Sequence, residues 1–141
     1  VNKLGLVMSD KVNNPSHYTS HHSGVECIEL TEHLNFNRGN ALKYVWRHQL
    51  KNASKEDLQK AAWYIKREIA REEKLDPTEY AQAQRNLESA YDTLYEYYFA
   101  YAQCEFIGFV DDIIFGHDSD LLDALKYVNS LIEEIYRNDV R

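Results

Sequence analysis

The sequence predicts an all-α protein, a bundle of about five helices preceded by an irregular N-terminal loop. Its 141 residues include only 2 Pro and 5 Gly, whereas a β-sandwich or β-barrel needs a turn every ~8–12 residues. Hydrophobic residues make up 44% and charged residues 28% of the chain, which is an ordinary balance for a globular domain. Long segments without breakers, in which apolar residues recur at helical spacing, favour helices.

The N-terminal part is expected to be irregular, with residues 1–12 forming a flexible N-terminus. The turn signal Asn13-Asn14-Pro15-Ser16 precedes a polar run of His, Tyr and Ser without any period. A short first helix is predicted over residues 25–34. Glu26, Glu29 and His33 would form a polar stripe along it, because they are spaced at i, i+3 and i+7.

A second helix is predicted from Asn37 to Gln49. Its apolar face consists of Ala41, Leu42, Val45 and Trp46. A second face, spaced at i, i+3, i+4 and i+7, consists of Asn40, Lys43, Tyr44 and Arg47. This second face is the densest basic patch in an acidic chain.

A third helix is expected to begin after Ser54, a good N-cap residue, and to extend toward Lys74. Its buried stripe is predicted to consist of Leu58, Ala61, Ala62, Ile65 and Ile69. The charged segment 66–74 is expected to be solvated.

Two further helices are predicted in the second half. Asp76, Pro77 and Glu79 occupy the N-cap, N1 and N3 positions of a helix start. This fourth helix is expected to continue to Gly108, and a fifth helix is expected over residues 120–137. The apolar positions of the fifth helix recur with near-heptad spacing at Leu121, Leu125, Val128, Ile132 and Ile135, with Leu122 and Leu131 widening the face. Residues 76–141 would thus form a helical hairpin that supplies core and oligomer contacts.

Eight aromatic residues near the end of the fourth helix predict a homo-oligomer. They are Tyr91, Tyr95, Tyr97, Tyr98, Phe99, Tyr101, Phe106 and Phe109. They surround the helix, and exposed aromatic patches of this kind usually mark interfaces. The alternative is a monomer in which the fifth helix and the N-terminal segment cover these rings.

Composition excludes several classes of protein. The net charge of −7 argues against a general nucleic-acid coat, which needs basic surface. The two cysteines, Cys27 and Cys104, lack metal-ligand spacing and favour a reducing cytoplasm. No apolar run approaches the ~20 residues of a membrane span. The G-x-x-x-x-G-K-[ST] and G-x-G-x-x-G nucleotide motifs are absent from the sequence.

Two groups of residues are candidates for chemistry. Lys43 and Arg47 lie one helical turn apart and suit a phosphate, and Asn40 could recognise a base or a sugar hydroxyl. Glu26 and Glu29 could hold a divalent ion or act as a base. The alternative interpretation of both groups is a charged helix surface in contact with solvent.

The order of several motifs resembles a family of small bacteriophage proteins described as SaV-like or as phage nucleotide kinases. The motifs are Asn14-Pro15-Ser16-His17-Tyr18, Gly24-Val25-Glu26-Cys27-Ile28-Glu29, Phe36-Asn37-x-Gly39-Asn40-Ala41-x-Lys43-Tyr44-x-Trp46-Arg47 and Glu56-Asp57-Leu58-x-Lys60-Ala61-x-Trp63-Tyr64. The resemblance covers residues 13–70. The chain departs from the family pattern after Lys51, where Asn52-Ala53-Ser54 replaces a Gly-containing turn.

This resemblance implies an oligomeric enzyme that transfers a phosphoryl group to deoxynucleoside monophosphates without a Walker loop, in the cytoplasm of an infected bacterium. It places a nucleotide site within residues 13–75. His17 would contact phosphate, Tyr18 would stack on a base, and Glu26 and Glu29 would hold Mg²⁺ or orient the acceptor. The nucleotide-binding set would be Ser16, Tyr18, Asn40, Lys43, Tyr44 and Arg47, with His17, Glu26, Glu29 and Arg47 as the catalytic set.

Two alternatives remain open. One is a non-catalytic phage protein that binds a nucleotide or a host protein. The other is an all-α pyrophosphohydrolase of the MazG type, which uses E-x-x-E followed by E-x-x-D. The first motif occurs at Glu26 and Glu29, but the only E-x-x-D is Glu73/Asp76, far downstream.

Overall fold

The structure, a computed structural model, describes residues 26–51, 55–88, 107–116 and 119–139 of the chain. All of the regular structure in these ranges is helical, and they contain no strand. The helices are α2 (Cys27–Thr31), α3 (Phe36–Lys51), α4 (Lys55–Glu72), a helix over residues 77–88, α6 (Ile107–Phe115) and α7 (Ser119–Asp139). The all-α prediction is therefore confirmed.

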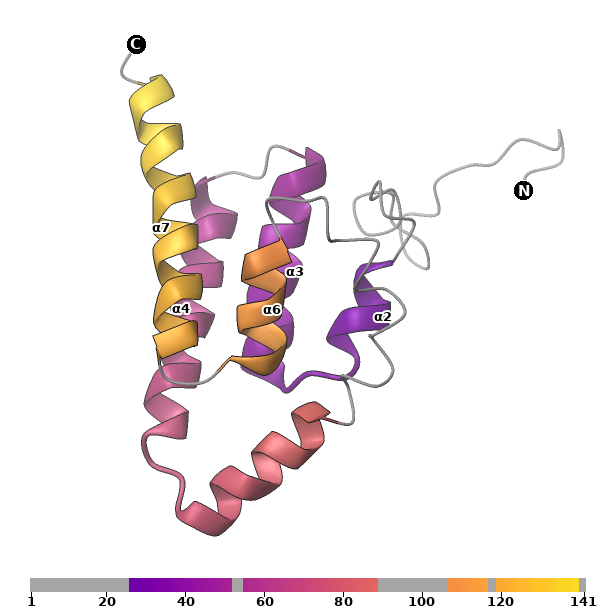
Figure 1. The fold of residues 1–141 in the computed structure, drawn as a ribbon. Helices are drawn as coiled ribbons and strands as arrows, with labels where there is room; N and C mark the ends of the chain where they lie inside the picture. Colours follow the sequence, from indigo (N-terminus) through magenta and orange to yellow (C-terminus); the bar gives the residue numbers. More distant parts are fainter. Residues whose placement is uncertain (1–25, 52–54, 89–106, 117–118, 140–141) are drawn as a thin grey trace, which may run out of the picture.

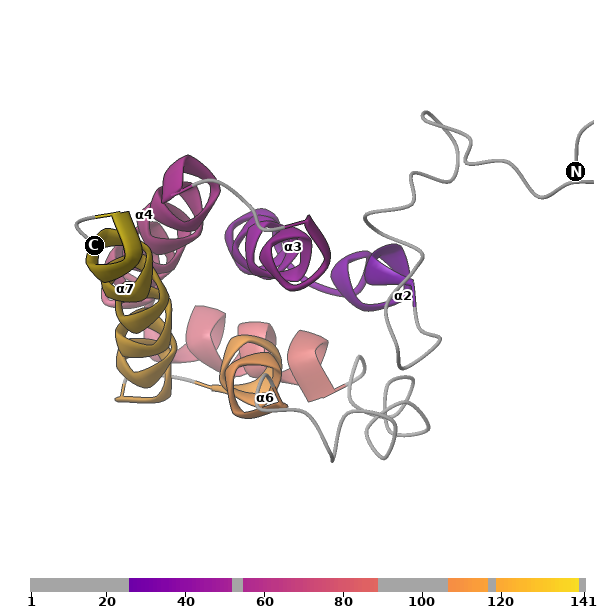
Figure 2. The same ribbon diagram turned by 90° about the horizontal axis from the view of Figure 1, so that it is seen from above.

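Helix α3 lies at the centre of the molecule. It packs against α2, α4 and α6, while α7 packs against α4 and α6. Seen from above, α2, α3, α4 and α7 form a curved row, and α6 lies on its inner side (Figure 2). The helix over residues 77–88 runs obliquely below this group (Figure 1). The side of α3 and α4 that faces away from α6 is consequently left as outer surface.

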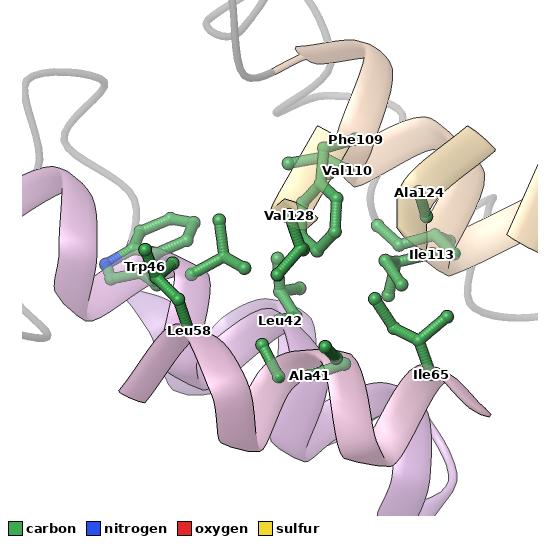
Figure 3. Close-up of a cluster of buried hydrophobic side chains, with 14 of the residues drawn as sticks. Ala41, Leu42, Trp46, Leu58, Ile65, Phe109, Val110, Ile113, Ala124 and Val128 are labelled. Atoms are coloured by element: carbon green, nitrogen blue, oxygen red, sulfur yellow. The ribbon is translucent and has the colours of Figure 1, made fainter. Parts of the chain in front are cut away.

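The core lies between α3, α4, α6 and α7 (Figure 3). The predicted apolar face of α3 is buried at Ala41, Leu42, Val45 and Trp46. Facing residues from the other three helices are Leu58, Ile65, Phe109, Ile113, Ala124 and Val128. Burial of each large apolar side chain contributes about 1.5–3 kcal/mol. This core fixes the relative positions of α3 and α4, whose outer sides carry the candidate site.

The predicted cap of the fourth helix is present. The Asp76 N–H donates to Glu79 Oε2 at 3.0 Å, and the Glu79 N–H donates to Asp76 Oδ1 at 2.8 Å. These reciprocal bonds satisfy two N–H groups that the helix itself leaves without partners. Residues 77–88 are accordingly helical.

The expectation that one helix continues from Asp76 to Gly108 is wrong at its far end. Gly108 lies in the first turn of α6, which continues to Phe115. Helix α6 also has a different direction from the helix over residues 77–88 (Figure 1). Because segment 107–115 is almost wholly apolar, its sequence reads as a continuation of the preceding pattern rather than as a new helix.

Some predicted features of the other helices also need correction. The segment 66–74 was expected to be solvated, but Glu68 and Glu72 are buried. Leu122, placed on the buried face of the fifth helix, is exposed. Phe109, grouped with the oligomer-forming aromatic residues, is buried in the core and stacks on Tyr127 with ring centroids 5.3 Å apart.

Several predictions concern residues outside the described ranges. These are the Ser54 cap, the flexible residues 1–12 and the aromatic residues from 91 to 106. The homo-oligomer stays a prediction. None of the helices in the described ranges combines the length and the apolar character that crossing a membrane would require.

A cluster of carboxylates at the junction of α6 and α7 predicts pH-dependent stability. Burial, together with the nearby Asp120, Asp123 and Asp111 carboxylates, raises the pKa of Asp112 to about 6. The folded protein therefore holds this proton more tightly than the unfolded chain. Stability from this group is complete below the ordinary pKa of 3.8 and is lost as the pH rises through about 6.

Replacing Asp112 by Asn should raise the midpoint of thermal unfolding at pH 7.5 by about 3 °C, corresponding to about 1 kcal/mol after allowance for solvent screening. The gain should shrink toward pH 4.5, where the wild-type carboxyl becomes protonated. Glu88→Gln, an equal change of charge at an exposed position, should give no such pH dependence. An equal effect of Asp112→Asn at both pH values would contradict the prediction.

Candidate functional site

Four aromatic side chains form a continuous patch on the outer side of α3 and α4. The Tyr44 and Tyr64 rings stack with centroids 6.1 Å apart and an interplanar angle of 15°. Phe36 and Trp63 each meet Tyr64 edge-on, at 5.7 Å and 5.1 Å. Phe36 is 73% exposed and Trp63 is 59% exposed. Exposed apolar groups of this size, gathered in one place, usually mark a binding surface. We call Phe36, Tyr44, Trp63 and Tyr64 the aromatic patch.

The core determines where the aromatic patch lies. Val45 and Ile65 are buried between the helices. Tyr44 and Tyr64, which precede them in sequence, lie at the edge of the α3–α4 interface and are partly buried against the core. Trp63 is one further residue around α4, so its ring projects outward.

Cations lie at one end of the aromatic patch, around Tyr44. Lys43 Nζ is 4.5 Å from the centre of the Tyr44 ring. Lys60 Nζ, from the first half of α4, is 5.6 Å from the same ring. Both distances suit cation–π attraction.

A cavity of about 630 Å³ lies at the other end of the patch. It is lined by Phe36, Asn37, Trp63, Tyr64, Arg67, Ala70, Arg71, Lys74 and Leu75. This lining includes two guanidinium groups and one ammonium group but no carboxylate. In a protein of net charge −7, the cavity is therefore a local positive region beside exposed rings.

Glu68 holds two of the cavity's polar side chains in place. Its carboxylate accepts hydrogen bonds from Asn37 Nδ2 at 3.1 Å, from Asn35 Nδ2 at 3.0 Å and from Arg71 Nη2 at 2.6 Å. Burial raises the pKa of Glu68, but the hydrogen bonds from Arg71, Asn35 and Asn37 outweigh burial and leave the pKa below its ordinary value. The carboxylate is thus ionised and fixes Asn37 and Arg71 at the cavity.

A buried ion pair continues this network inward. Arg38 Nη2 donates to the Glu72 carboxylate and, at 2.8 Å, to the Gly116 carbonyl. Arg38 Nη1 donates to the Ile113 carbonyl at 2.7 Å. One guanidinium group therefore joins the start of α3 to the end of α4 and the end of α6.

A second cavity, of about 490 Å³, adjoins the first. The two share Phe36, Asn37 and Arg71. The remaining lining of the second cavity is His33, Leu34, Asn35, Arg38, Glu72, Ala83, Asn86 and Leu87. It thus extends from the loop before α3 to the helix over residues 77–88.

The structure brings together three of the predicted nucleotide-binding residues. Lys43 Nζ donates to Asn40 Oδ1 at 2.9 Å and lies over Tyr44. Asn40 Nδ2 donates to the Phe36 carbonyl at 2.8 Å. Arg47 lies one turn further along α3 and is half-buried, and its Nε has no hydrogen-bond partner among the described residues. Ser16, His17 and Tyr18 lie outside those residues.

Glu26 and Glu29 lie at the start of α2. The Glu26 N–H donates to Glu29 Oε2 at 2.7 Å, so the Glu29 carboxylate caps this helix. Within the described ranges, no group of three or more His, Cys, Asp and Glu side chains is placed to hold a metal ion. The predicted Mg²⁺ at this pair stays a prediction.

Cys27 is a small residue buried in the core. Burial raises the pKa of its thiol to about 12, although the Lys43 ammonium and a hydrogen bond with Thr31 act in the opposite direction. The thiol is therefore protonated at neutral pH and is not a nucleophile.

Sequence reasoning missed several residues of the site. They are Phe36 and Asn37 at the start of α3, Trp63, Arg67 and Arg71 on α4, and Lys74 in the turn after it. A signal for three of them was present, because Trp63, Arg67 and Arg71 recur at helical spacing on one face of α4. Cations and an exposed tryptophan on one face of an acidic protein are unusual enough to single that face out.

Comparisons with curated proteins and with solved structures found no match to the chain. One protein family does match part of it. The matched residues include α2, α3 and most of α4, together with all four members of the aromatic patch, and they end just before Arg67. Residues 12–66 match the family described as "Protein of unknown function (DUF3310)".

Proposed function

We propose that this chain binds nucleoside phosphates at the aromatic patch and the larger cavity beside it. The observation that carries the proposal is the placement of two exposed rings, Phe36 and Trp63, next to Arg67, Arg71 and Lys74. A nucleobase is flat and stacks on aromatic side chains. Phosphate oxygens pair with guanidinium and ammonium groups. The two halves of a nucleotide thus find matching chemistry side by side.

Asn37 supplies a group suited to recognition of the base or sugar. Asn37 lines the larger cavity, and its Nδ2 donates to Glu68, which leaves the side-chain oxygen as the acceptor for a ligand. Arg71 is held by the same carboxylate, so both groups are ordered before a ligand arrives. Such ordering reduces the entropy lost on binding.

The proposal extends to phosphoryl transfer on a different ground, the resemblance to phage nucleotide kinases. In this form the substrate is a deoxynucleoside monophosphate, and His17, Glu26, Glu29 and Arg47 carry the roles that the resemblance implies. The pyrophosphohydrolase alternative has less support, because Asp76, the last residue of its E-x-x-D motif, caps a helix with its carboxylate.

Intrinsic fluorescence tests binding directly. The chain has two tryptophans, and Trp46 is 0% exposed whereas Trp63 is 59% exposed. Quenching by a stacked base therefore reports on Trp63. We expect deoxynucleotides to quench it in a saturable manner. Arg67→Gln should weaken binding at least tenfold, since a hydrogen bond to a charged group contributes about 1.5–3 kcal/mol.

Lys126→Gln is the matched control, because it removes an exposed cation on α7. It should leave the dissociation constant unchanged. Lack of quenching by every deoxynucleotide, or equal effects of Arg67→Gln and Lys126→Gln, would contradict the proposed site.

Product analysis separates the enzymatic alternatives. A kinase converts a deoxynucleoside monophosphate and ATP, with Mg²⁺, to a deoxynucleoside diphosphate. A pyrophosphohydrolase converts a deoxynucleoside triphosphate to the monophosphate and pyrophosphate. Saturable quenching without either product would indicate a non-catalytic nucleotide-binding protein. The ligand-bound form of such a protein could engage a host protein.

A further inference from the structure

We infer that the ligand of this site is longer than one nucleotide, a short single-stranded oligonucleotide lying along the outer face of α4. The inference rests on the proposed function, because it uses the same rings and cations. It adds the class of ligand. Three features of the site support it: its length, the order of its groups and the charges that remain for a ligand.

The first observation is the length of the charged and aromatic face. Lys60, Trp63, Arg67 and Arg71 follow one another at intervals of three or four residues on α4, so they share one side of the helix. Lys74 lies in the turn that follows α4 and lines the larger cavity together with Arg67 and Arg71. We call these five residues the α4 stripe. At ~1.5 Å per residue the helical part of the stripe, from Lys60 to Arg71, is about 17 Å long, which exceeds what one base with its own phosphate can cover.

The second observation is the order of the groups. Lys43 and Lys60 flank Tyr44 at one end of the aromatic patch, and the cations of the larger cavity lie at the other end. A nucleoside mono- or triphosphate carries all its charge at one end of its base and can engage only one of these cation groups. A single strand alternates bases with phosphates, so it can engage the rings and both cation groups together.

The third observation concerns the available charge. Lys60 pairs with Glu56 at 3.2 Å, and Arg71 pairs with Glu68. Arg67 and Lys74 form no ion pair with another of the described residues. The stripe can therefore neutralise about two or three phosphates. Because the whole chain carries −7, a strand gains nothing beyond the stripe, and the site is limited to roughly four nucleotides.

The test compares 5′-phosphorylated oligothymidylates of one, two, four and eight nucleotides, with quenching of Trp63 as the readout. From one to four nucleotides the dissociation constant should fall more than tenfold. A tetranucleotide can place any one of its four nucleotides in a mononucleotide site, and this statistical effect alone lowers the dissociation constant by a factor of four at most. From four to eight nucleotides the dissociation constant should fall by less than a further factor of three. The slope of log affinity against log salt should be about −2 for the tetranucleotide, since each phosphate of a single strand contributes about −0.7.

Matched variants locate the additional contacts. Lys60→Gln should weaken the tetranucleotide more than thymidine monophosphate, because Lys60 lies at the end remote from the larger cavity. Lys66→Gln removes an exposed cation from a different face of the same helix and should change neither ligand. Circular dichroism of each variant verifies the fold.

The outcomes separate this inference from the proposed function. If the dissociation constants of the mononucleotide and the tetranucleotide differ by no more than the statistical factor of four, the inference is wrong and the proposed mononucleotide site stands. If neither ligand quenches Trp63, both fail. If a duplex of eight base pairs competes as well as the single strand, the attraction is general electrostatics without stacking, and the inference is overturned.

Discussion

Replacement of Arg38 by Met is expected to lower the free energy of unfolding by about 3–5 kcal/mol, the usual result of removing one partner from a buried ion pair. The guanidinium group is almost wholly buried and donates to Glu72 and to the Ile113 and Gly116 carbonyls. Met fills a similar volume but offers no donor. The Glu72 carboxylate would then stay buried without its cation, and two carbonyls would lose their hydrogen bonds.

Urea unfolding measures this effect. Lys66→Met, which removes an exposed cation from α4, should change the free energy of unfolding by less than about 0.5 kcal/mol. Combining Arg38→Met with Glu72→Gln should restore part of the loss, because the second change removes the uncompensated charge. A loss below 1 kcal/mol for Arg38→Met alone would show that the ion pair contributes little to the fold.

The buried network also explains why the sequence could predict the helices better than their charged contacts. The faces of α3, α4 and α7 follow from the spacing of their apolar residues, and the core uses those residues. Arg38, Glu68 and Glu72 instead occur in strongly charged segments that are typical of solvated helix surfaces. They leave water only because the fold brings the start of α3 to the end of α4, where Arg38 also meets the Ile113 and Gly116 carbonyls at the end of α6.

Helix α6 was missed for a related reason. Periodicity identifies a helix when apolar and polar residues alternate around it, and segment 107–115 has two adjacent acidic residues in an otherwise apolar run. Its burial on several sides erases the pattern that would mark its boundaries. Gly116, which ends it, was recognisable as a breaker, whereas its beginning was not.

The candidate site also combines features that helical spacing predicts with features that depend on the packing of helices. Asn40, Lys43 and Tyr44 could be grouped from the sequence because they lie on one helix at i, i+3 and i+4 spacing. Phe36 and Tyr64 are far apart in the sequence, and their contact depends on how α3 packs on α4. Helical spacing can therefore group the residues of each helix, and the tertiary fold brings the two groups into contact.

The junction between α6 and α7 is the second place where a small change should have a large effect. Gly116 is buried, and its N–H donates to the Asp112 carbonyl at 2.9 Å. A Cβ added here would lie 2.5 Å from the Cβ of Asp120 and closer still to the Asp112 carbonyl oxygen. Side chains essentially never approach backbone this closely, so the chain itself would have to move.

Gly116→Ala should therefore lower the free energy of unfolding by about 3 kcal/mol, at the upper end of the cost of overpacking. The displacement needed to relieve the clash also moves the Gly116 carbonyl, which accepts from Arg38 at 2.8 Å. The loss thus includes part of the buried network. Urea unfolding of the purified variant gives the value.

Gly108→Ala is the matched control within the same helix. A Cβ at Gly108 meets nothing within 4 Å, and alanine favours helix by up to about 1 kcal/mol over glycine. We expect this variant to be neutral or more stable than the wild type. Equal losses from the two substitutions would mean that α6 tolerates no side chain at either glycine, and the close approach at the α6–α7 junction would not be the cause.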